Sequence, residues 1–115
     1  MTTLYHNPRC SKSRAAVDLL NERGLKFETV KYLQDTPSEK ELAKVVKMLG
    51  IHPADLARKG EKRFKELDLV SQNLTDQQWI AILAENPVLI ERPIVVHNGK
   101  AAIGRPIENI AKILG

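Results

Sequence analysis

The chain contains one cysteine, Cys10, and the residues around it favour a reactive thiolate. Cys10 directly precedes a predicted helix, so its sulfur lies near unpaired backbone N–H groups and the positive end of the helix dipole. Three cationic side chains also stand within four residues of it: Arg9, Lys12 and Arg14. Both influences lower the pKa of a thiol, and the thiolate is the nucleophile. We therefore predict a nucleophilic Cys10 with a lowered pKa, in preference to the alternative of a small buried apolar residue.

A single cysteine has consequences for redox chemistry. It allows no internal disulfide, which is typical of a reducing compartment, so we expect a cytoplasmic protein. Ser13 stands where a C-x-x-C redox motif has its second sulfur. Any bond that Cys10 forms to a substrate must therefore be resolved by a thiol from another molecule.

Two Arg-Pro pairs, Arg92-Pro93 and Arg105-Pro106, flank predicted strands near the C-terminus. Proline cannot donate to a sheet ladder, so Pro93 is expected at the first position of the strand that follows it. The loop before that strand is predicted to lie beside the helix that begins after Cys10. Guanidinium groups bind tetrahedral oxyanions through paired hydrogen bonds and stay charged. A thiolate beside Arg92 and Arg105 can bind an oxyanion and attack its central atom.

His6 stands four residues before Cys10 and has two interpretations. It can hydrogen-bond within the cysteine loop, or it can donate or accept a proton near neutral pH. The histidines (His6, His52 and His97) and Cys10 do not have the spacing of a metal site. We also find no glycine-rich phosphate loop. We expect no metal and no bound cofactor.

Hydrophobic periodicity and capping signals predict the elements that position these residues. Gly24 is expected to end the first helix, and capping boxes at Ser38/Glu41 and Thr75/Gln78 are expected to begin two later ones. Asn98-Gly99 is a strong hairpin signal. The predicted order is a strand over 2–6, a helix over 11–23, a strand over 27–32, a helical block over 38–87, strands at 94–96 and 100–103, and a helix from Pro106.

This order predicts an α/β protein. The first strand, helix and strand form a parallel unit, whose crossover is nearly always right-handed. The order β-α-β, helical insertion, β-β-α is thioredoxin-like and gives a four-stranded mixed sheet. At 115 residues the chain is the size of one domain, so we expect a single domain over 1–115 with the helical insertion at about 38–87.

The composition and the net charge limit the kinds of partner that the protein is expected to bind. The chain has 43% hydrophobic and 28% charged residues, typical of a globular protein, without a signal peptide or an apolar run of membrane-spanning length. The net charge is +4, but most basic residues neighbour acidic ones and aromatic residues are few. We therefore expect the protein to bind a small anion, with no nucleic acid and no membrane as partner. We expect a monomer, because nothing in the sequence demands a larger assembly.

Four segments together resemble the ArsC family of glutaredoxin- and glutathione-dependent arsenate reductases. They are His6-Asn7-Pro8-x-Cys10-x-x-Ser13-Arg14, Arg58-Lys59, Glu91-Arg92-Pro93-Ile94-Val95-Val96 and Gly104-Arg105-Pro106. The resemblance extends along the chain and implies a thioredoxin-like fold with a cis peptide at Arg92-Pro93. The chain departs from resistance-plasmid members in its cysteine loop and in lacking their C-terminal tail, so it resembles a shorter branch.

The resemblance implies roles for individual residues. Cys10 would be the nucleophile, and arsenate and later the arsenite intermediate would be bound by an arginine trio, Arg58, Arg92 and Arg105. His6 would tune the cysteine loop, with Ser13, Arg14 and Pro93 supporting the site around it. Glutathione would be the co-substrate, and glutaredoxin would remove it as a mixed disulfide before arsenite leaves.

Two other functions fit parts of the pattern. One is a monothiol, glutaredoxin-like oxidoreductase that acts on glutathione mixed disulfides or on another oxyanion, for which Cys10 would matter more than Arg58 and Arg105. The other is a non-enzymatic regulator similar to the Spx proteins, which share this fold and bind RNA polymerase. Those proteins usually carry a C-x-x-C switch, whose second position here is Ser13, so this alternative is the weaker.

Overall fold

The computed structural model describes residues 1–115, which form four strands, five α-helices and three short 3₁₀ turns. The elements follow the chain in this order: β1 (Thr2–Tyr5), α1 (Ser11–Glu22), β2 (Glu28–Val30), α2 (Glu39–Leu49), a 3₁₀ turn (Pro53–Leu56), α3 (Lys62–Glu66), a 3₁₀ turn (Leu69–Ser71), α4 (Asp76–Glu85), a 3₁₀ turn (Pro87–Leu89), β3 (Ile94–His97), β4 (Lys100–Ile103) and α5 (Glu108–Ile113).

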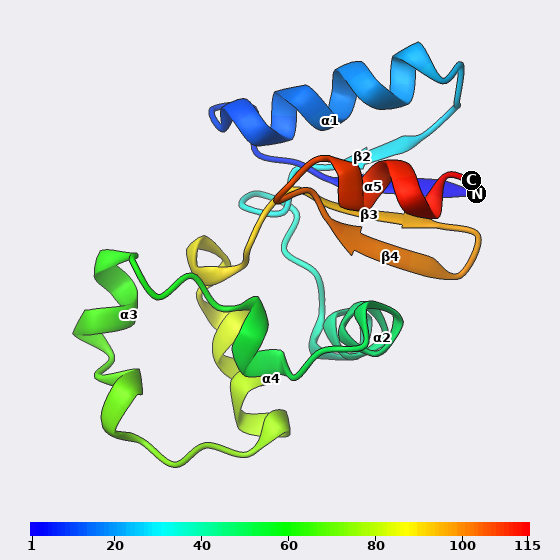
Figure 1. The fold of residues 1–115 in the computed structure, drawn as a ribbon. Helices are drawn as coiled ribbons and strands as arrows, with labels where there is room; N and C mark the ends of the chain where they lie inside the picture. Colours follow the sequence, from blue (N-terminus) through cyan, green and yellow to red (C-terminus); the bar gives the residue numbers. More distant parts are fainter. The chain divides into compact units, whose positions relative to one another are not determined.

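The chain divides into two compact units. The first comprises Met1–Asp35 and Arg92–Gly115 and contains the whole sheet with α1 and α5 (Figure 1). The second comprises Thr36–Glu91 and contains only helices and turns. The predicted α/β class with a four-stranded mixed sheet is confirmed. The organisation as one domain with an insertion stays a prediction.

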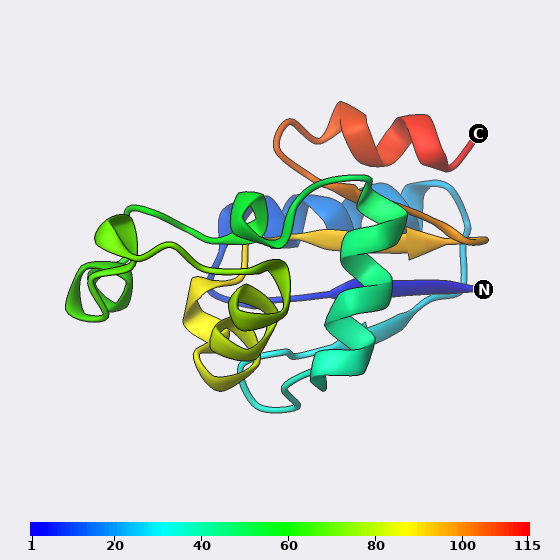
Figure 2. The same cartoon turned by 90° about the horizontal axis from the view of Figure 1, so that it is seen from below.

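The sheet brings four loops of the first unit to one edge. Its strand order is β2-β1-β3-β4, with β1 and β2 parallel and the other neighbours antiparallel. The carboxyl ends of β1, β2 and β4 and the amino end of β3 therefore lie at the same edge. Figures 1 and 2 show both chain termini at the opposite end, away from the start of α1. Cys10 and the two Arg-Pro pairs all follow or precede strands at the shared edge.

One face of the sheet carries the core of the first unit. Leu4, Val95 and Ala102 are paired neighbours on three adjacent strands. α1 and α5 both pack on this face, because their buried residues join the same cluster. The remaining fully buried members are Ala16, Leu20 and Ile110. Complete burial of each leucine or isoleucine side chain contributes about 1.5–3 kcal/mol, so this packing holds α1 and α5 against the sheet.

The helix ends follow the sequence signals. α1 is followed by Gly24, whose φ of 67° is the left-handed conformation that glycine adopts without strain. The Ser38 hydroxyl accepts the N–H of Glu41 at 3.1 Å at the start of α2. At α4 the capping box is complete, since Thr75 and Gln78 bond each other's backbone N–H groups at 3.2 and 2.9 Å.

Two element boundaries predicted from the sequence are wrong. The second strand is shorter than the predicted 27–32, because the Lys31 carbonyl accepts the N–H groups of Gln34 and Asp35 in a turn. The last helix begins at Glu108 rather than at Pro106. The hairpin signal is confirmed, since Asn98 and Gly99 have φ values of 49° and 80° between β3 and β4.

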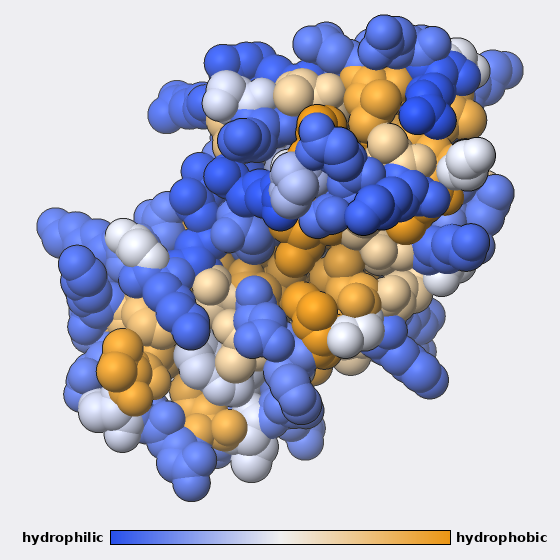
Figure 3. Space-filling view, in the orientation of Figure 1, coloured by the Kyte–Doolittle hydropathy of each residue, from blue (hydrophilic) through white to orange (hydrophobic).

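The second unit has its own buried aliphatic and aromatic side chains. Leu56 and Leu83 are fully buried, and the rings of Phe64 and Trp79 stack with their centroids 6.2 Å apart. Hydrophilic residues cover much of the molecular face seen in Figure 3. None of the helices combines the length and the apolar character that a membrane crossing requires.

Gly104 offers a test of the packing between the loops at the site edge. A Cβ added there would lie 2.7 Å from both the Pro93 Cγ and the Ile110 Cδ1, although the backbone can accept a side chain. We predict that Gly104→Ala lowers the free energy of unfolding by about 1–3 kcal/mol through overpacking. Urea denaturation measures this.

Gly60→Ala is the matched control, because a Cβ at Gly60 meets no atom within 4 Å. Its free energy of unfolding should stay within about 0.5 kcal/mol of the parent protein. Equal stability of the two variants would contradict the packing described for Gly104.

Candidate active site

Cys10 occupies the position just before the first turn of α1. Its backbone is extended, with φ −93° and ψ 124°, and its side chain is 8% exposed. The sulfur lies against the first-turn backbone and interacts with the N–H groups of Lys12 and Ser13 and with the Ser13 hydroxyl. The helix start therefore provides donors for a negatively charged sulfur.

The pKa of Cys10 is lowered, as the sequence predicts. Burial acts in the opposite direction and raises the pKa. It is outweighed by the hydrogen bonds from the backbone N–H groups of Ser13 and Lys12, then by the Ser13 hydroxyl and by the positive charge of Arg105. Each of these groups favours the thiolate over the thiol.

The cation beside the sulfur is not one of those adjacent in sequence. Arg9, Lys12 and Arg14 were expected to lower the pKa of Cys10 through their charges, and this expectation is wrong. Arg14 instead donates from Nη1 to the Pro8 carbonyl at 3.0 Å, across the cysteine loop. The charge comes from Arg105, whose Nη2 lies 3.5 Å from the Cys10 sulfur. Only the strand pairing brings these two residues together.

Arg105 is fixed by a second hydrogen bond. Its Nε donates to the Arg92 carbonyl at 2.8 Å, while Nη2 faces the sulfur. The Gly104 N–H donates to the Pro93 carbonyl at 2.8 Å, so the loops that carry the two arginines are joined through their backbones as well. The peptide bonds Arg92-Pro93 and Arg105-Pro106 are both cis. The structure thus gathers Cys10, Arg92 and Arg105 at one edge of the sheet.

Arg58 belongs to the second unit and is bound there by two carboxylates. Its Nη1 lies 2.7 Å from Glu61, and its Nε lies 3.4 Å from Glu91. The backbone N–H of Arg58 also donates to the Leu89 carbonyl at 2.7 Å, next to an antiparallel bridge between residues 57 and 90. These contacts hold the guanidinium in a defined place within its unit. Its participation in a site with Cys10 stays a prediction.

Ser13 and His6 support the cysteine loop in different ways. The fully buried Ser13 hydroxyl accepts the Asn7 N–H at 3.4 Å and so ties the loop to α1. His6 is buried, and its backbone N–H donates to the Val30 carbonyl at 2.8 Å. Burial lowers the pKa of His6, and the charges of Lys31 and Arg14 lower it further. His6 is therefore a neutral imidazole near neutral pH, which argues against proton donation by a charged ring.

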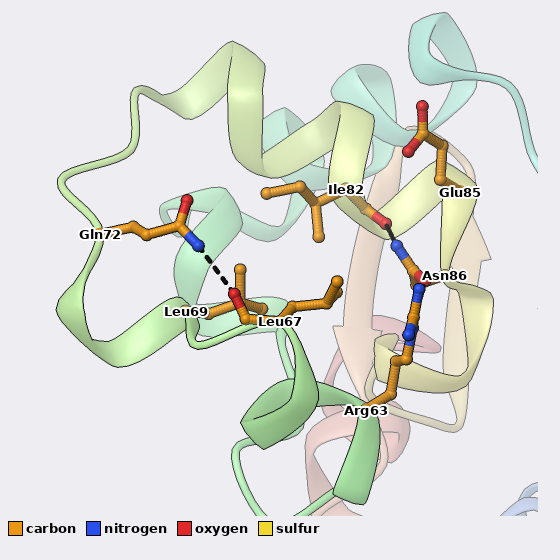
Figure 4. Close-up of a pocket in the computed structure, with 7 residues that line it drawn as sticks. All are labelled: Arg63, Leu67, Leu69, Gln72, Ile82, Glu85 and Asn86. Carbon is orange, nitrogen blue, oxygen red and sulfur yellow. Dashed lines mark hydrogen bonds between the residues drawn. The ribbon is translucent and has the colours of Figure 1, made fainter.

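The second unit has a pocket of its own, of about 310 Å³, between α3 and α4 (Figure 4). Its polar side chains bond within the unit: Arg63 to Asn86, Asn86 to the Ile82 carbonyl, and Gln72 to the Leu67 carbonyl. It contains no cysteine. No group of three or more His, Cys, Asp or Glu side chains is placed to hold a metal ion.

The sequence profile of the ArsC family matches residues 5–113, which covers nearly the whole chain and all the residues of this site. The chain belongs to the ArsC family. An arsenate reductase of Neisseria meningitidis is 48% identical over 112 residues, or 96% of each chain. An Escherichia coli arsenate reductase is 37% identical over 97% of this chain and 79% of its own length.

Solved structures of ArsC-type proteins agree with the fold described above. The arsenate reductase from Vibrio cholerae superposes with a TM-score of 0.93 and 43% sequence identity, covering 97% of this chain and 96% of that one. The predicted family and the predicted thioredoxin-like fold are both confirmed.

Removal of the Ser13 hydroxyl tests the hydrogen bonds at the start of α1. The rate of Cys10 alkylation follows the thiolate fraction, so it rises as pH increases through the pKa of Cys10. Because the Ser13 hydroxyl favours the thiolate, Ser13→Ala should move the midpoint to higher pH and slow alkylation at neutral pH. The measurement is the pH dependence of the iodoacetamide reaction rate.

Ser11→Ala is the matched control, since Ser11 is exposed one position into the same helix. Its midpoint should equal that of the parent protein. A midpoint that is the same in all three proteins would rule out the Ser13 hydroxyl as a determinant of the Cys10 pKa.

Proposed function

We propose that this protein is an arsenate reductase in which the Cys10 thiolate attacks arsenate bound by Arg92, Arg105 and Arg58. The proposal rests mainly on one observation, the Arg105 guanidinium 3.5 Å from the sulfur of a cysteine whose pKa is lowered. The same guanidinium that stabilises the thiolate can bind an oxygen of an incoming oxyanion. Relatives named arsenate reductase at up to 48% identity supply the choice of arsenate among tetrahedral oxyanions.

The arginines suit a doubly charged substrate. A guanidinium offers five N–H donors in a rigid plane and stays charged, so several of them can share an oxyanion. Arg58 uses two of its nitrogens toward Glu61 and Glu91, which leaves its remaining nitrogen for the anion. Partial burial of the Arg58 and Arg105 side chains strengthens such contacts, because the surrounding dielectric is lower than in water.

The reduction needs thiols from outside the chain. The Cys10 thiolate forms a bond to arsenic, and one arsenate oxygen leaves as water. The thiol of glutathione then forms a second As–S bond, and a second arsenic-bound oxygen leaves as water. Attack of a glutaredoxin thiol on the glutathione sulfur forms a mixed disulfide and leaves the electron pair on arsenic, which passes from As(V) to As(III). Water then replaces the Cys10 sulfur on arsenic, so that the Cys10–As bond breaks, arsenite leaves and the thiolate is restored. Glutathione and glutaredoxin together supply the two electrons.

The proposal that thiols from outside the chain complete the reaction is supported by the sequence, since Cys10 is the only cysteine. We place the reaction in the cytoplasm, where glutathione keeps thiols reduced. The protein itself holds no cofactor in this scheme; glutathione is a co-substrate.

Replacement of the nucleophile is the primary test. Cys10→Ser should reduce arsenite formation to the uncatalysed rate, because a serine hydroxyl is not ionised at neutral pH. The assay couples arsenate reduction to NADPH oxidation through glutathione reductase and glutaredoxin, with arsenite quantified directly. Arsenite formation that persists in Cys10→Ser contradicts the proposal.

A parent protein that alkylates rapidly at Cys10 but forms no arsenite would favour the monothiol alternative, in which the same thiolate exchanges with glutathione mixed disulfides. That alternative is examined by following deglutathionylation of a mixed disulfide in the same preparation.

Arginine-to-lysine variants test the oxyanion site. Lysine keeps the charge but not the planar pair of donors, so Arg92→Lys and Arg105→Lys should each raise the KM for arsenate about tenfold. Arg23→Lys, at an exposed position after α1, is the control and should leave the KM unchanged. Unchanged KM values in the Arg92 and Arg105 variants would remove these residues from the site.

A further inference from the structure

A pocket of about 390 Å³ lies beside the loop that leads into Cys10. Residues 6–9 line one side, and Lys31, Leu33 and Gln34 from the turn after β2 line the other. All belong to the first unit. The pocket is at the carboxyl ends of the parallel neighbours β1 and β2, the edge at which open α/β sheets commonly bind ligands. Its volume is in the range of small-molecule sites.

The lining of this pocket is electropositive. It contains two cations, Arg9 and Lys31, and no acidic residue. Both cationic side chains are exposed, and neither forms a salt bridge with a carboxylate of the protein. Their charges are therefore available to a ligand that carries carboxylates.

A buried, unpartnered polar atom gives an independent indication of a ligand. His6 lines the pocket and is only 9% exposed, yet its Nδ1 has no hydrogen-bond partner. An unsatisfied buried nitrogen is costly, so a bound polar group that reaches it is favoured. The Asn7 and Gln34 amides on the two sides match the N–H and C=O groups of a peptide.

The strand order places this pocket and the arginines on different sides of the cysteine loop. The Cys10 loop follows β1, which lies between β2 and β3 in the sheet. Lys31 follows β2, whereas Arg92 and Arg105 adjoin β3 and β4 (Figure 1). The pocket is therefore on the β2 side of the cysteine loop, and the two arginines are on the β3 and β4 side.

We infer that this pocket binds the thiol co-substrate, a small peptide thiol with carboxylates such as glutathione, through the charges of Lys31 and Arg9. The inference deepens the proposed function, on which it rests for the use of a thiol co-substrate. The arginines then hold the oxyanion while Lys31 and Arg9 hold the incoming thiol.

Disulfide exchange tests the pocket without arsenate. The Cys10 thiolate attacks one sulfur of oxidised glutathione, the S–S bond breaks, Cys10 becomes a mixed disulfide and one glutathione leaves as its thiolate. Bis(2-hydroxyethyl) disulfide is the neutral comparison. Lys31→Glu should raise the half-saturating concentration of oxidised glutathione roughly fivefold, and Lys31→Gln should have a smaller effect in the same direction. The rate with the neutral disulfide should stay unchanged in both variants.

Lys112→Glu is the matched control. Lys112 is an exposed lysine on α5, and its replacement by glutamate changes the net charge by the same amount as Lys31→Glu. It should behave as the parent protein does with both disulfides. The inference is overturned if Lys31→Glu leaves the reaction with oxidised glutathione unchanged, if it slows both disulfides equally, or if Lys112→Glu has the same effect. Failure of arsenate reduction would not alter these exchange results, so the two proposals fail separately.

Discussion

Stabilisation of a negative sulfur at the start of α1 is the interaction on which the rest of this structure depends. The N–H groups of Lys12 and Ser13 face the Cys10 sulfur because the helix begins there. Together with the Ser13 hydroxyl and the charge of Arg105, they outweigh the effect of burial on its pKa. Packing of α1 and α5 on one face of the sheet holds α1 in place. The sulfur can therefore be both shielded and ionised, two properties that ordinarily oppose each other.

The mixed sheet supplies the second part of the arrangement. Reversal of β3 relative to β1 turns its amino end toward the edge where β1 ends, and β4 returns to the same edge. Arg92 and Arg105 are thereby brought to Cys10 although they are far from it in sequence. The hydrogen bond from Arg105 to the Arg92 carbonyl at 2.8 Å makes the position of one guanidinium depend on the loop of the other. One edge of the sheet thus positions Cys10, Arg92 and Arg105 together.

Features governed by neighbouring residues could be predicted from the sequence. The cap at Ser38, the capping box at Thr75, the left-handed Gly24 and the hairpin at Asn98 each depend on a few consecutive residues, and the structure has all of them. The position of Cys10 before a helix is of the same kind. The element order then led to the fold class, since strand–helix–strand units have few arrangements.

Features governed by long-range packing could not be read in the same way. Sequence proximity pointed to Arg9, Lys12 and Arg14 as the charges beside the sulfur, but exposed side chains on a loop and a helix turn outward or bond locally, as Arg14 does to Pro8. The role proposed for Lys31 also had no local signal, because its relation to the cysteine loop arises only when β2 pairs with β1.

The most direct test of the central claim is whether arsenate protects Cys10 from alkylation. A bound oxyanion beside the sulfur should slow the iodoacetamide reaction in a saturable manner, and the protection should be lost in Arg105→Lys and retained in Arg23→Lys. That result would place the anion, the thiolate and Arg105 in one site. Rapid alkylation of the parent protein at saturating arsenate, or equal protection in both variants, would contradict the account.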